Sequence, residues 1–550
     1  MSEVGKALSY NLCDSPAILV LNSRGESEEL SLRDVFRRAP ELNRLVGEVP
    51  TVAFVQLRLL LAIMYRALEG PDTVAQWRGW AADWSRVVQA VDEYFEHFED
   101  RFDLYSPARP FMQVAGLSSA KGEVFGLDRI IADVPTGFPY MTTRGGWALE
   151  RIPHGEAFRW LLHAHAADTS GIKTSMVGDP RGKGGKGYPQ GPGWVGQIGG
   201  VFLEADTLAQ SLLLNLVPLG DFNLVSGDAD LPIWERDPLG AGVDESCGGE
   251  PRGVIDVYAW QARRVLLKAD ESGVTGVLIG YGDRPEVRNR QQFEPMTAWR
   301  YSERQTKKHG CTVYMPREHR VEVGFWRGLA ALLPKAPRRT VKTGQVQVEP
   351  PVLLEWAARA QLDGLIPAGS WRVNATGVAY GPQQSTFGEI IHDQIVLPSV
   401  VLADDALAVM VQDAIDIAVA VAQVVARLAV NLCEATGGSG DSLDGPREDA
   451  YRRAYTLFGR SFGEWIRDAD NPLEAGMYLG LWRRTLEREA RELGENLIEE
   501  AGIQGWRGHH RDGRRIDIGQ ADAWFHHNLA KVLTHAQSKE SASREQETHE

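Results

Sequence analysis

The first hundred residues alternate apolar and polar positions in a pattern that predicts a small strand unit followed by helices. An apolar run at 17–21 meets a turn at 22–25 and then Glu29-Leu30, which predicts a strand-turn-strand unit. Ser31 is a typical N-cap for a helix that runs to Leu45. Over residues 52–68, apolar side chains recur at helical spacing, which predicts a second helix.

The middle of the chain is rich in turn residues and short apolar runs. Eleven glycines lie between residues 171 and 200, too many for a regular element, and helices are predicted on either side, at 156–167 and 206–216. Residues 217–330 alternate short apolar runs with polar loops, as in a mixed sheet. Residues 332–351 hold four prolines and four basic side chains, which is typical of a surface connection.

After about residue 397 the pattern is helical to the end. Four amphipathic segments, 402–436, 447–468, 472–501 and 518–536, are separated by breaks rich in Gly, Asp or Pro, and a four-helix bundle is the economical way to pack them. We therefore predict the fold class α+β. A large mixed α/β domain over residues 1–395 carries the functional loops, a four-helix bundle occupies 396–536, and 537–550 form a disordered tail.

Composition restricts the class of protein. The 550 residues contain 59 Lys plus Arg and 74 Asp plus Glu, a formal net charge of −15, with 43% hydrophobic and 24% charged residues. These values exclude a disordered chain, a collagen-like fibre and a small disulfide-stapled protein. The acidic total argues against a protein that coats nucleic acid non-specifically, although it averages over faces of different charge.

Cysteine usage and hydropathy favour a cytoplasmic protein. The four cysteines, Cys13, Cys247, Cys311 and Cys433, are far apart and include no CxxC pair, which argues against a local zinc or redox motif. The first residues lack the features of a secretory signal. The most apolar long segment, 400–430, is interrupted by charged residues, so we expect a soluble helix.

The glycine-rich stretch 178–187 is the most conspicuous candidate for chemistry. Its glycines allow close backbone approach, and Lys183 and Lys186 supply positive charge, as in a phosphate cradle. No Ser or Thr follows a GK pair as in a Walker A loop, and no strand leads into a helix as in a dinucleotide fingerprint. A surface loop without function is the competing interpretation.

Histidine patterns give no convincing catalytic or metal site. His163 and His165 are two apart in a predicted helix, so they point to different faces. His392-Asp393 resembles the HD dipeptide of metal-dependent phosphohydrolases, but the rest of that set is missing. Neither GxSxG nor HExxH occurs. The lack of a catalytic set favours a binding protein that is not an enzyme and has no metal or other cofactor.

Basic side chains are grouped despite the acidic total. Several groups lie in loops beside tryptophans such as Trp194, Trp299 and Trp506, which raises the expectation of nucleic-acid contact. The groups are Arg181/Lys183/Lys186, Arg284/Arg288/Arg290, Lys307/Lys308, Arg338/Arg339, Arg452/Arg453, Arg483/Arg484 and Arg507/Arg511/Arg514/Arg515.

The order of these features resembles the large subunit of the type I-E CRISPR surveillance complex, Cascade. The resemblance begins with Tyr10-Asn11-Leu12 and Asp14, followed by the helix start Ser31-Leu32. Pro110-Phe111-Met112-Gln113 is a fairly specific string of that subunit. The glycine-rich loop before the helix at 208–215 and the terminal bundle extend the similarity over essentially the whole chain.

The resemblance implies a non-catalytic DNA-recognition subunit in antiviral defence. Such a subunit is expected to read the protospacer-adjacent motif in double-stranded target DNA, start unwinding, and support the displaced strand of the R-loop. Its implied partners are the CRISPR RNA, the other Cascade subunits and a helicase-nuclease effector. In the family, the guide RNA reads sequence while protein loops read the short motif.

The resemblance assigns individual residues to these loops. The sequence departs from the family pattern at the RNA-proximal loop, and no Lys lies where a lysine finger is expected, so Arg284, Arg288 or Arg290 could substitute. Bundle arginines are further candidates for contact with the duplex or the displaced strand. The predicted residues are Gly182, Lys183, Gly184, Gly185, Lys186 and Gly187 of the glycine loop, Gln383 and Gln384 of the glutamine wedge, Tyr140, Met141 and Thr142 of the RNA-proximal loop, and Arg284, Arg288, Arg452, Arg453, Arg483 and Arg484.

Two alternatives compete with this hypothesis. One is a metal-dependent nucleotide or phosphate-ester hydrolase that uses the glycine loop with His392 and Asp393. The other is an assembly scaffold whose complexes bind DNA without dependence on the motif.

Overall fold

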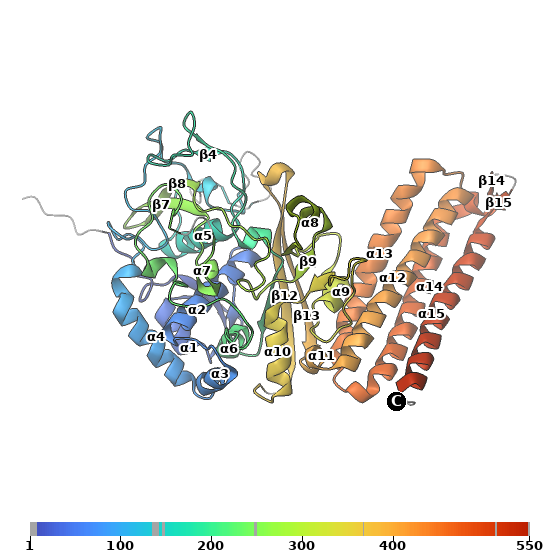
Figure 1. Cartoon of the computed structure of the whole chain (residues 1–550). Coiled ribbons are helices and arrows are strands. Elements are labelled where there is room, and N and C mark those ends of the chain that lie inside the picture. Colours follow the sequence, from blue (N-terminus) through green and yellow to red (C-terminus); the bar gives the residue numbers. More distant parts are fainter. Residues whose placement is uncertain are drawn as a thin grey trace, which may run out of the picture. The chain divides into compact units, whose positions relative to one another are not determined.

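The structure is a computed structural model and describes residues 8–134, 142, 144–145, 149–246, 250–366, 368–511 and 514–547 (Figure 1). The chain divides into two compact units. Unit 1 comprises Met1–Glu322, Arg338–Leu365 and Trp371–Gln394, and unit 2 comprises Val323–Pro337, Ile366–Ser370 and Ile395–Glu550. The main division lies next to the predicted boundary at 395/396, but two short segments expected in the first domain belong to unit 2.

Unit 1 begins with a three-stranded antiparallel sheet in the order β2-β1-β3. Its strands are β1 (Ile18–Asn22), β2 (Ser27–Leu30) and β3 (Leu42–Leu45). Ser31 caps α1 (Leu32–Arg38) by accepting a hydrogen bond from the Asp34 backbone N–H at 3.1 Å. The prediction of one helix to Leu45 was wrong, because residues 42–45 pair with β1 instead of extending the helix.

The core of unit 1 forms around α2 (Pro50–Ala67), whose side chains are buried almost along its whole length. It contacts α4 (Trp84–Phe98), α5 (His154–Ala167), α6 (Leu208–Asn215) and α7 (Val254–Tyr258), while α3 (Val74–Ala81) packs on α4. α2 even buries Arg58, which pairs with the buried Glu294 at 2.8 Å. Such a pair is tolerated in a core because each charge neutralises the other.

The remaining strands of unit 1 form small separate sheets whose strands pair antiparallel, and not the mixed sheet that the alternating pattern over 217–330 predicted. β6 (Gly200–Glu204), β12 (Ser370–Tyr380) and β13 (Phe387–Pro398) form one sheet in the order β13-β12-β6. β7 (Arg263–Asp270) and β8 (Gly273–Tyr281) form a long hairpin, and β4 (Lys173–Thr174) pairs with β5 (Lys186–Gly187). β9 (Trp299–Tyr301), β10 (Tyr314–Pro316) and β11 (Val348–Glu349) form another sheet, accompanied by α8 (Glu303–His309) and α10 (Val352–Leu362).

Unit 2 contains four long helices that lie side by side, α12 (Asp405–Ala435), α13 (Asp444–Trp465), α14 (Ala475–Arg507) and α15 (Ile518–Glu547) (Figure 1). α12 contacts each of the other three, and α14 contacts α13 and α15. The predicted helical C-terminal region is confirmed. α15 continues past residue 536, where the sequence pattern ended it, and the disorder expected for 537–550 stays a prediction.

The short helices α9 (Phe325–Gly328) and α11 (Val400–Ala403) complete unit 2. Trp326 explains why residues 323–337 belong there: its ring packs against those of Tyr455 and Phe462, with centroids 6.4 and 5.3 Å apart. A small hairpin, β14 (His509–Arg511) with β15 (Arg514–Ile516), joins α14 to α15 where the sequence suggested only an irregular break.

Two helices are long and apolar enough by composition to cross a membrane, α2 and α12. In both, most of the apolar segment is buried inside the protein, 78% in α2 and 67% in α12. Core helices of soluble proteins have the same property, so this is weak evidence for a membrane span.

Candidate nucleic-acid interface

The glycine loop ends in a tight β-hairpin. Lys183 and Lys186 exchange both backbone hydrogen bonds, at 3.0 and 3.1 Å. The two residues between them, Gly184 and Gly185, have φ of +58° and +73°. Positive φ at both central positions defines a type I′ turn, which glycine forms without a Cβ penalty. The glycine-rich sequence therefore builds a narrow, regular tip.

This tip carries unneutralised positive charge. Lys183 and Lys186 are both exposed, and neither makes an ion pair within the part of the chain that the structure describes. A hydrogen-bonded cross-strand pair places its side chains on the same face, and like charges in that position are destabilising. Lys121 adds a third exposed cation, because its stem lies against Gly185. An arrangement that is unfavourable in the free protein becomes favourable when an anion binds between the lysines.

Arg181, by contrast, is an anchor of the loop. Its guanidinium pairs with Asp179 at 2.9 Å and donates to the carbonyls of Tyr281 and Gly282 at 2.7 and 2.8 Å. The guanidinium of Arg181 is thus used within the loop, on Asp179, and at the end of β8, which supports the loop. The sequence analysis grouped Arg181 with the two lysines, but in the structure Arg181 holds the loop in place and the lysines lie exposed at its tip.

The predicted glutamine wedge lies at an exposed and strained turn. Gln383 and Gln384 form the tip between β12 and β13, and both have positive φ, 56° and 57°. This conformation is uncommon for residues other than glycine and is found at functional sites more often than elsewhere. Both side chains are exposed, and no hydrogen bond from either is found among the described residues. The turn therefore presents two amides to solvent.

A short segment joins this wedge to the glycine hairpin. The Ser170 backbone N–H donates to the Gln384 carbonyl at 2.7 Å, and Tyr281 donates from its hydroxyl to the Gly171 carbonyl at 2.5 Å. Directly after these residues, Lys173 in β4 pairs with Gly187 in β5, at the base of the glycine hairpin. Residues 168–174 therefore support both loops at once, although the loops are far apart in sequence.

A buried charge cluster fixes the start of that segment. Asp168 is 8% exposed, accepts from the Lys173 ammonium at 2.6 Å, and pairs with the guanidinium of Arg263. Arg263 also donates to the carbonyls of Asp168, Thr169 and Gly191. Burial opposes ionisation, but Lys173 and Arg263 hold the pKa of Asp168 below its ordinary value.

Of the three arginines proposed in place of a lysine finger, Arg284 is the best placed. It is exposed, follows the end of β8 that holds Arg181, and has no ion pair with any described residue. Arg288 is engaged with His309 at 2.7 Å, and Arg290 pairs with Glu250 at 3.1 Å. The sequence alone does not indicate which of these three arginines takes the position of the lysine finger.

The RNA-proximal loop is only partly covered by the structure. Tyr140 and Met141 lie outside the described residues. The Thr142 hydroxyl accepts from the Arg144 backbone N–H at 3.0 Å, and Arg144 pairs with Asp133 at 3.1 Å and Glu156 at 2.7 Å. The role of this loop stays a prediction.

The arginines of unit 2 differ from one another. Arg452 and Arg453 are on the surface of α13, where both pair with Asp449 and Arg453 also contacts Glu500 at 2.6 Å. Arg484 is exposed, whereas Arg483 is buried at 8% exposure. Arg483 therefore does not belong to a surface patch, because its position on α14 faces the packed interior of the helices.

The Pro110–Gln113 string has a structural role. The Gln113 amide donates to the Leu104 carbonyl and accepts from the Leu267 backbone N–H, both at 2.8 Å. The Met112 carbonyl accepts from the buried His165 at 2.8 Å, and His163 is hydrogen-bonded to Thr51 at 2.9 Å. Both histidines are thus occupied in the core.

His163 and His165 predict how stability depends on pH. Burial lowers the pKa of each to about 4 from an ordinary value of 6.5. Between these values only the unfolded chain binds the protons, so the free energy of unfolding is undiminished above pH 6.5 and falls as the pH drops toward 4. The fall is about 1.4 kcal/mol per pH unit for each histidine.

Urea unfolding followed across this range measures the effect. His163→Gln removes one titrating group and is expected to reduce the slope of stability against pH. The same change at the exposed His392 is the control for the substitution itself. Equal slopes in both variants would contradict the assignment.

The residues of the hydrolase alternative are not assembled into a metal site. His392 is exposed on β13, and Asp393 accepts from the Gln394 backbone N–H at 2.8 Å. Within the described ranges, no three His, Cys, Asp or Glu side chains are grouped so as to hold a metal ion. Nothing here joins the glycine loop to His392.

The sequence matches the family described as CRISPR-associated protein Cse1 over residues 11–493. The chain belongs to the Cse1 family. A curated relative, CRISPR-associated protein CasA/Cse1 of Thermus thermophilus, is 29% identical over 348 residues, 62% of this chain and 63% of the relative. That match spans less than two thirds of the relative's length.

Solved Cse1 structures share the fold. Thermobifida fusca Cse1 is 39% identical, with a TM-score of 0.88 over 96% of this chain and 98% of its own. A chain of a structure titled "CRISPR RNA-guided surveillance complex" is 20% identical, has a TM-score of 0.62, covers 90% of this chain and 98% of its own, and shows the fold alone. The resemblance to the large subunit of type I-E Cascade is confirmed.

Proposed function

We propose that this Cse1 chain is the non-catalytic subunit that reads the protospacer-adjacent motif in double-stranded DNA. One observation supports this most directly: the exposed, strained Gln383-Gln384 turn and the Lys183–Lys186 hairpin share one support, residues 168–174. To read a few base pairs where unwinding starts, a protein needs a cationic tip and an amide wedge at a fixed distance from each other. The shared support provides that fixed spacing.

The parts have complementary tasks in this proposal. Lys183 and Lys186 neutralise phosphates, and the narrow Gly184-Gly185 tip approaches the minor groove, whose degenerate code suits a reader that tolerates several motifs. Gln384 inserts under the first base pair and replaces its lost base-edge hydrogen bonds, with Arg284 contacting the adjacent backbone. The charge of −15 is compatible with this role, because the contact is short and locally basic.

Family membership supports the wider setting. The chain works in CRISPR interference, and we propose that its partners are the CRISPR RNA, the other Cascade subunits, target DNA and a helicase-nuclease, all in the cytoplasm. Arg452, Arg453 and Arg484 are proposed contacts for the duplex or the displaced strand.

Replacement of the wedge glutamine tests the proposal. In complexes assembled with guide RNA, Gln384→Ala should weaken binding to motif-bearing duplex by about tenfold, since a base-edge contact contributes roughly 1–3 kcal/mol of discrimination. Affinities for duplexes with and without the motif, measured by filter binding, give the motif-dependent part of the binding free energy.

Gln394→Ala is the matched control, because Gln394 is an exposed glutamine of the same hairpin away from its tip. It should bind like wild type. If Gln384→Ala and Gln383→Ala both keep the full preference for the motif, this site assignment is wrong. If wild-type complexes show no preference at all, the scaffold alternative is favoured.

A further inference from the structure

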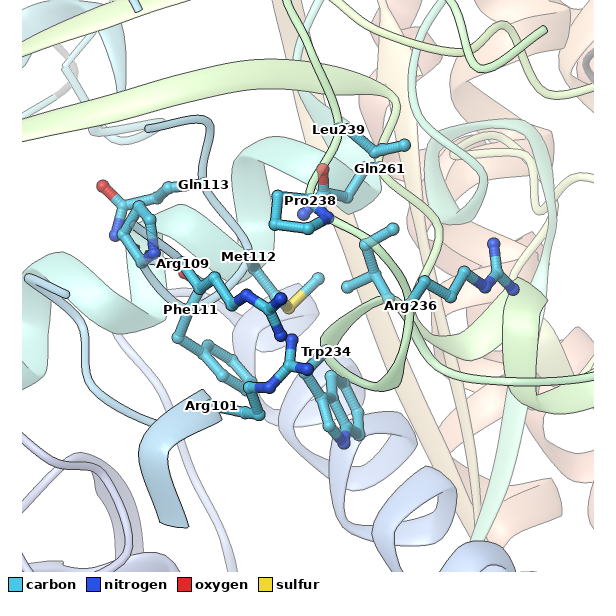
Figure 2. A pocket seen from close by; sticks show the side chains of 12 residues that line it. Arg101, Arg109, Phe111, Met112, Gln113, Trp234, Arg236, Pro238, Leu239 and Gln261 are labelled. Carbon is cyan, nitrogen blue, oxygen red and sulfur yellow. Dashed lines mark hydrogen bonds between the residues drawn. The ribbon is translucent and has the colours of Figure 1, made fainter. Parts of the chain in front are cut away.

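A second positively charged feature of unit 1 is a recess whose lining includes no residue of the glycine hairpin or the glutamine turn. The recess is a cavity of about 30 Å³ beside the Pro110–Gln113 string, and three arginines, Arg101, Arg109 and Arg236, line it (Figure 2). One water needs at least roughly 10–15 Å³, so this volume suits a small polar group rather than a whole base.

The floor of the recess is rigid and apolar. Phe111 stacks on Trp234 with ring centroids 5.4 Å apart and an interplanar angle of 25°, and Phe111 also stacks on Phe102 at 5.2 Å. Phe111 and Trp234 are 1% and 4% exposed, so neither ring face is open to an incoming base. A floor of this kind lowers the local dielectric, which strengthens the interaction of any charge above it.

Two guanidinium groups converge above this floor without a buried counter-charge. Figure 2 shows the side chains of Arg101 and Arg109 pointing toward one another, while Arg236 points away. The charge of Arg236 is paired with Asp256 at 2.6 Å. Arg101 has only Asp100 at 3.5 Å, whose carboxylate is 75% exposed, and Arg109 has no side-chain partner among the residues described.

An unmatched polar atom also lines the recess. The Gln261 side-chain oxygen is buried and has no hydrogen-bond partner within the described chain. Gln261 is 5% exposed, and its amide can present either its oxygen or its NH₂ group to the cavity, depending on rotation. A buried polar group without a partner is costly, so a bound group that satisfies it is favoured.

We propose that this recess binds a phosphate group of single-stranded nucleic acid. The planar forks of Arg101 and Arg109 match the non-bridging phosphate oxygens. The Gln261 amide, rotated so that its NH₂ group faces the cavity in place of its oxygen, supplies a further donor. A flexible single strand can bend one phosphate into a recess, which a stiff duplex resists. The preference for nucleic acid over other anions rests on the proposed function.

The test uses the full chain and short fluorescein-labelled oligonucleotides without any motif. Arg101→Gln and Arg109→Gln should each weaken single-strand binding about tenfold, the loss of one charge-assisted contact. Each should also lower the slope of log affinity against log salt concentration by about 0.7. The affinity is measured separately for RNA and DNA single strands of the same sequence. The comparison shows which of the two nucleic acids supplies the phosphate.

The matched control is Arg78→Gln, since Arg78 is an exposed arginine on α3 outside the recess. It should bind like wild type. The proposal is overturned if the recess variants keep wild-type affinity and salt slope for both single strands. It is also overturned if an acidic peptide competes as strongly as the oligonucleotides, because the recess then takes carboxylates.

Thermal stability separates a binding role from a structural one. Removing one of two converging guanidinium groups relieves repulsion, so Arg109→Gln should melt at the same temperature as wild type or higher. A clear fall in melting temperature would show that the arginines hold the fold and would overturn the proposal. Because these assays contain no motif, their result is independent of the Gln384 experiment.

Discussion

Replacing both Lys183 and Lys186 by alanine is expected to weaken the binding of the assembled complex to duplex DNA by about a hundredfold at low salt. Each lysine supplies one charge-assisted phosphate contact of roughly 1.5 kcal/mol or more. The slope of log affinity against log salt concentration should fall by about 1.8, because two fewer counterions are released. Titrations at several salt concentrations measure both quantities.

The same substitution should leave the fold intact. Lys183 and Lys186 repel one another across the hairpin, and the Gly184-Gly185 turn keeps its hydrogen bonds without either side chain. Lys342→Ala removes another exposed lysine of unit 1 and serves as the control. A double variant that binds with wild-type affinity and salt slope would show that the tip does not contact phosphates.

Asp168→Asn is expected to cost about 3–5 kcal/mol of folding stability, because it leaves the buried Arg263 charge and the partly buried Lys173 charge without their carboxylate. Motif binding should be lost along with stability, since the segment after Asp168 supports both the glycine hairpin and the glutamine turn. Urea unfolding measures the first effect and duplex binding by the folded fraction measures the second.

Asp363→Asn provides the comparison for that experiment. Asp363 pairs with Arg359 on the surface of α10, and exposed pairs of this kind contribute little to stability. A stable Asp168→Asn protein with normal motif binding would contradict the role of the buried cluster.

The sequence predicted the parts of the candidate site better than their connections. Glycine content identified the loop, but its type I′ geometry depends on the pairing of Lys183 with Lys186, which composition does not specify. The hydrogen bond from Ser170 to the Gln384 carbonyl joins residues that no local pattern relates. Periodicity describes the neighbours of a residue along the chain and carries no signal for such contacts.

The grouping of basic residues in the sequence gave wrong predictions of surface position for a related reason. Arg181 and Arg483 look like members of surface groups in the sequence, yet one anchors the glycine loop to β8 and the other is buried in α14. Whether an arginine faces solvent or a carbonyl depends on tertiary packing. The recess lined by Arg101 and Arg109 could not be predicted from the sequence, because its floor combines Phe111 with Trp234, which is distant along the chain.

The errors in the fold have the same origin. Residues 42–45 continue a helical pattern but form a strand, because β1 offers an edge that outweighs local propensity. Residues 323–337 join unit 2 through Trp326, a side chain whose partners lie more than a hundred residues further along the chain.

The wedge turn is fastened by main-chain atoms, the Ser170 N–H and the Gln384 carbonyl, and its side chains take no part in that attachment. Residues 383 and 384 can therefore change identity while the turn keeps its position, provided that they tolerate positive φ. Under the proposed function, the side chains that meet an altered motif can therefore change without rebuilding the domain. Asparagine, glycine and aspartate are the substitutions that this backbone would accept most readily.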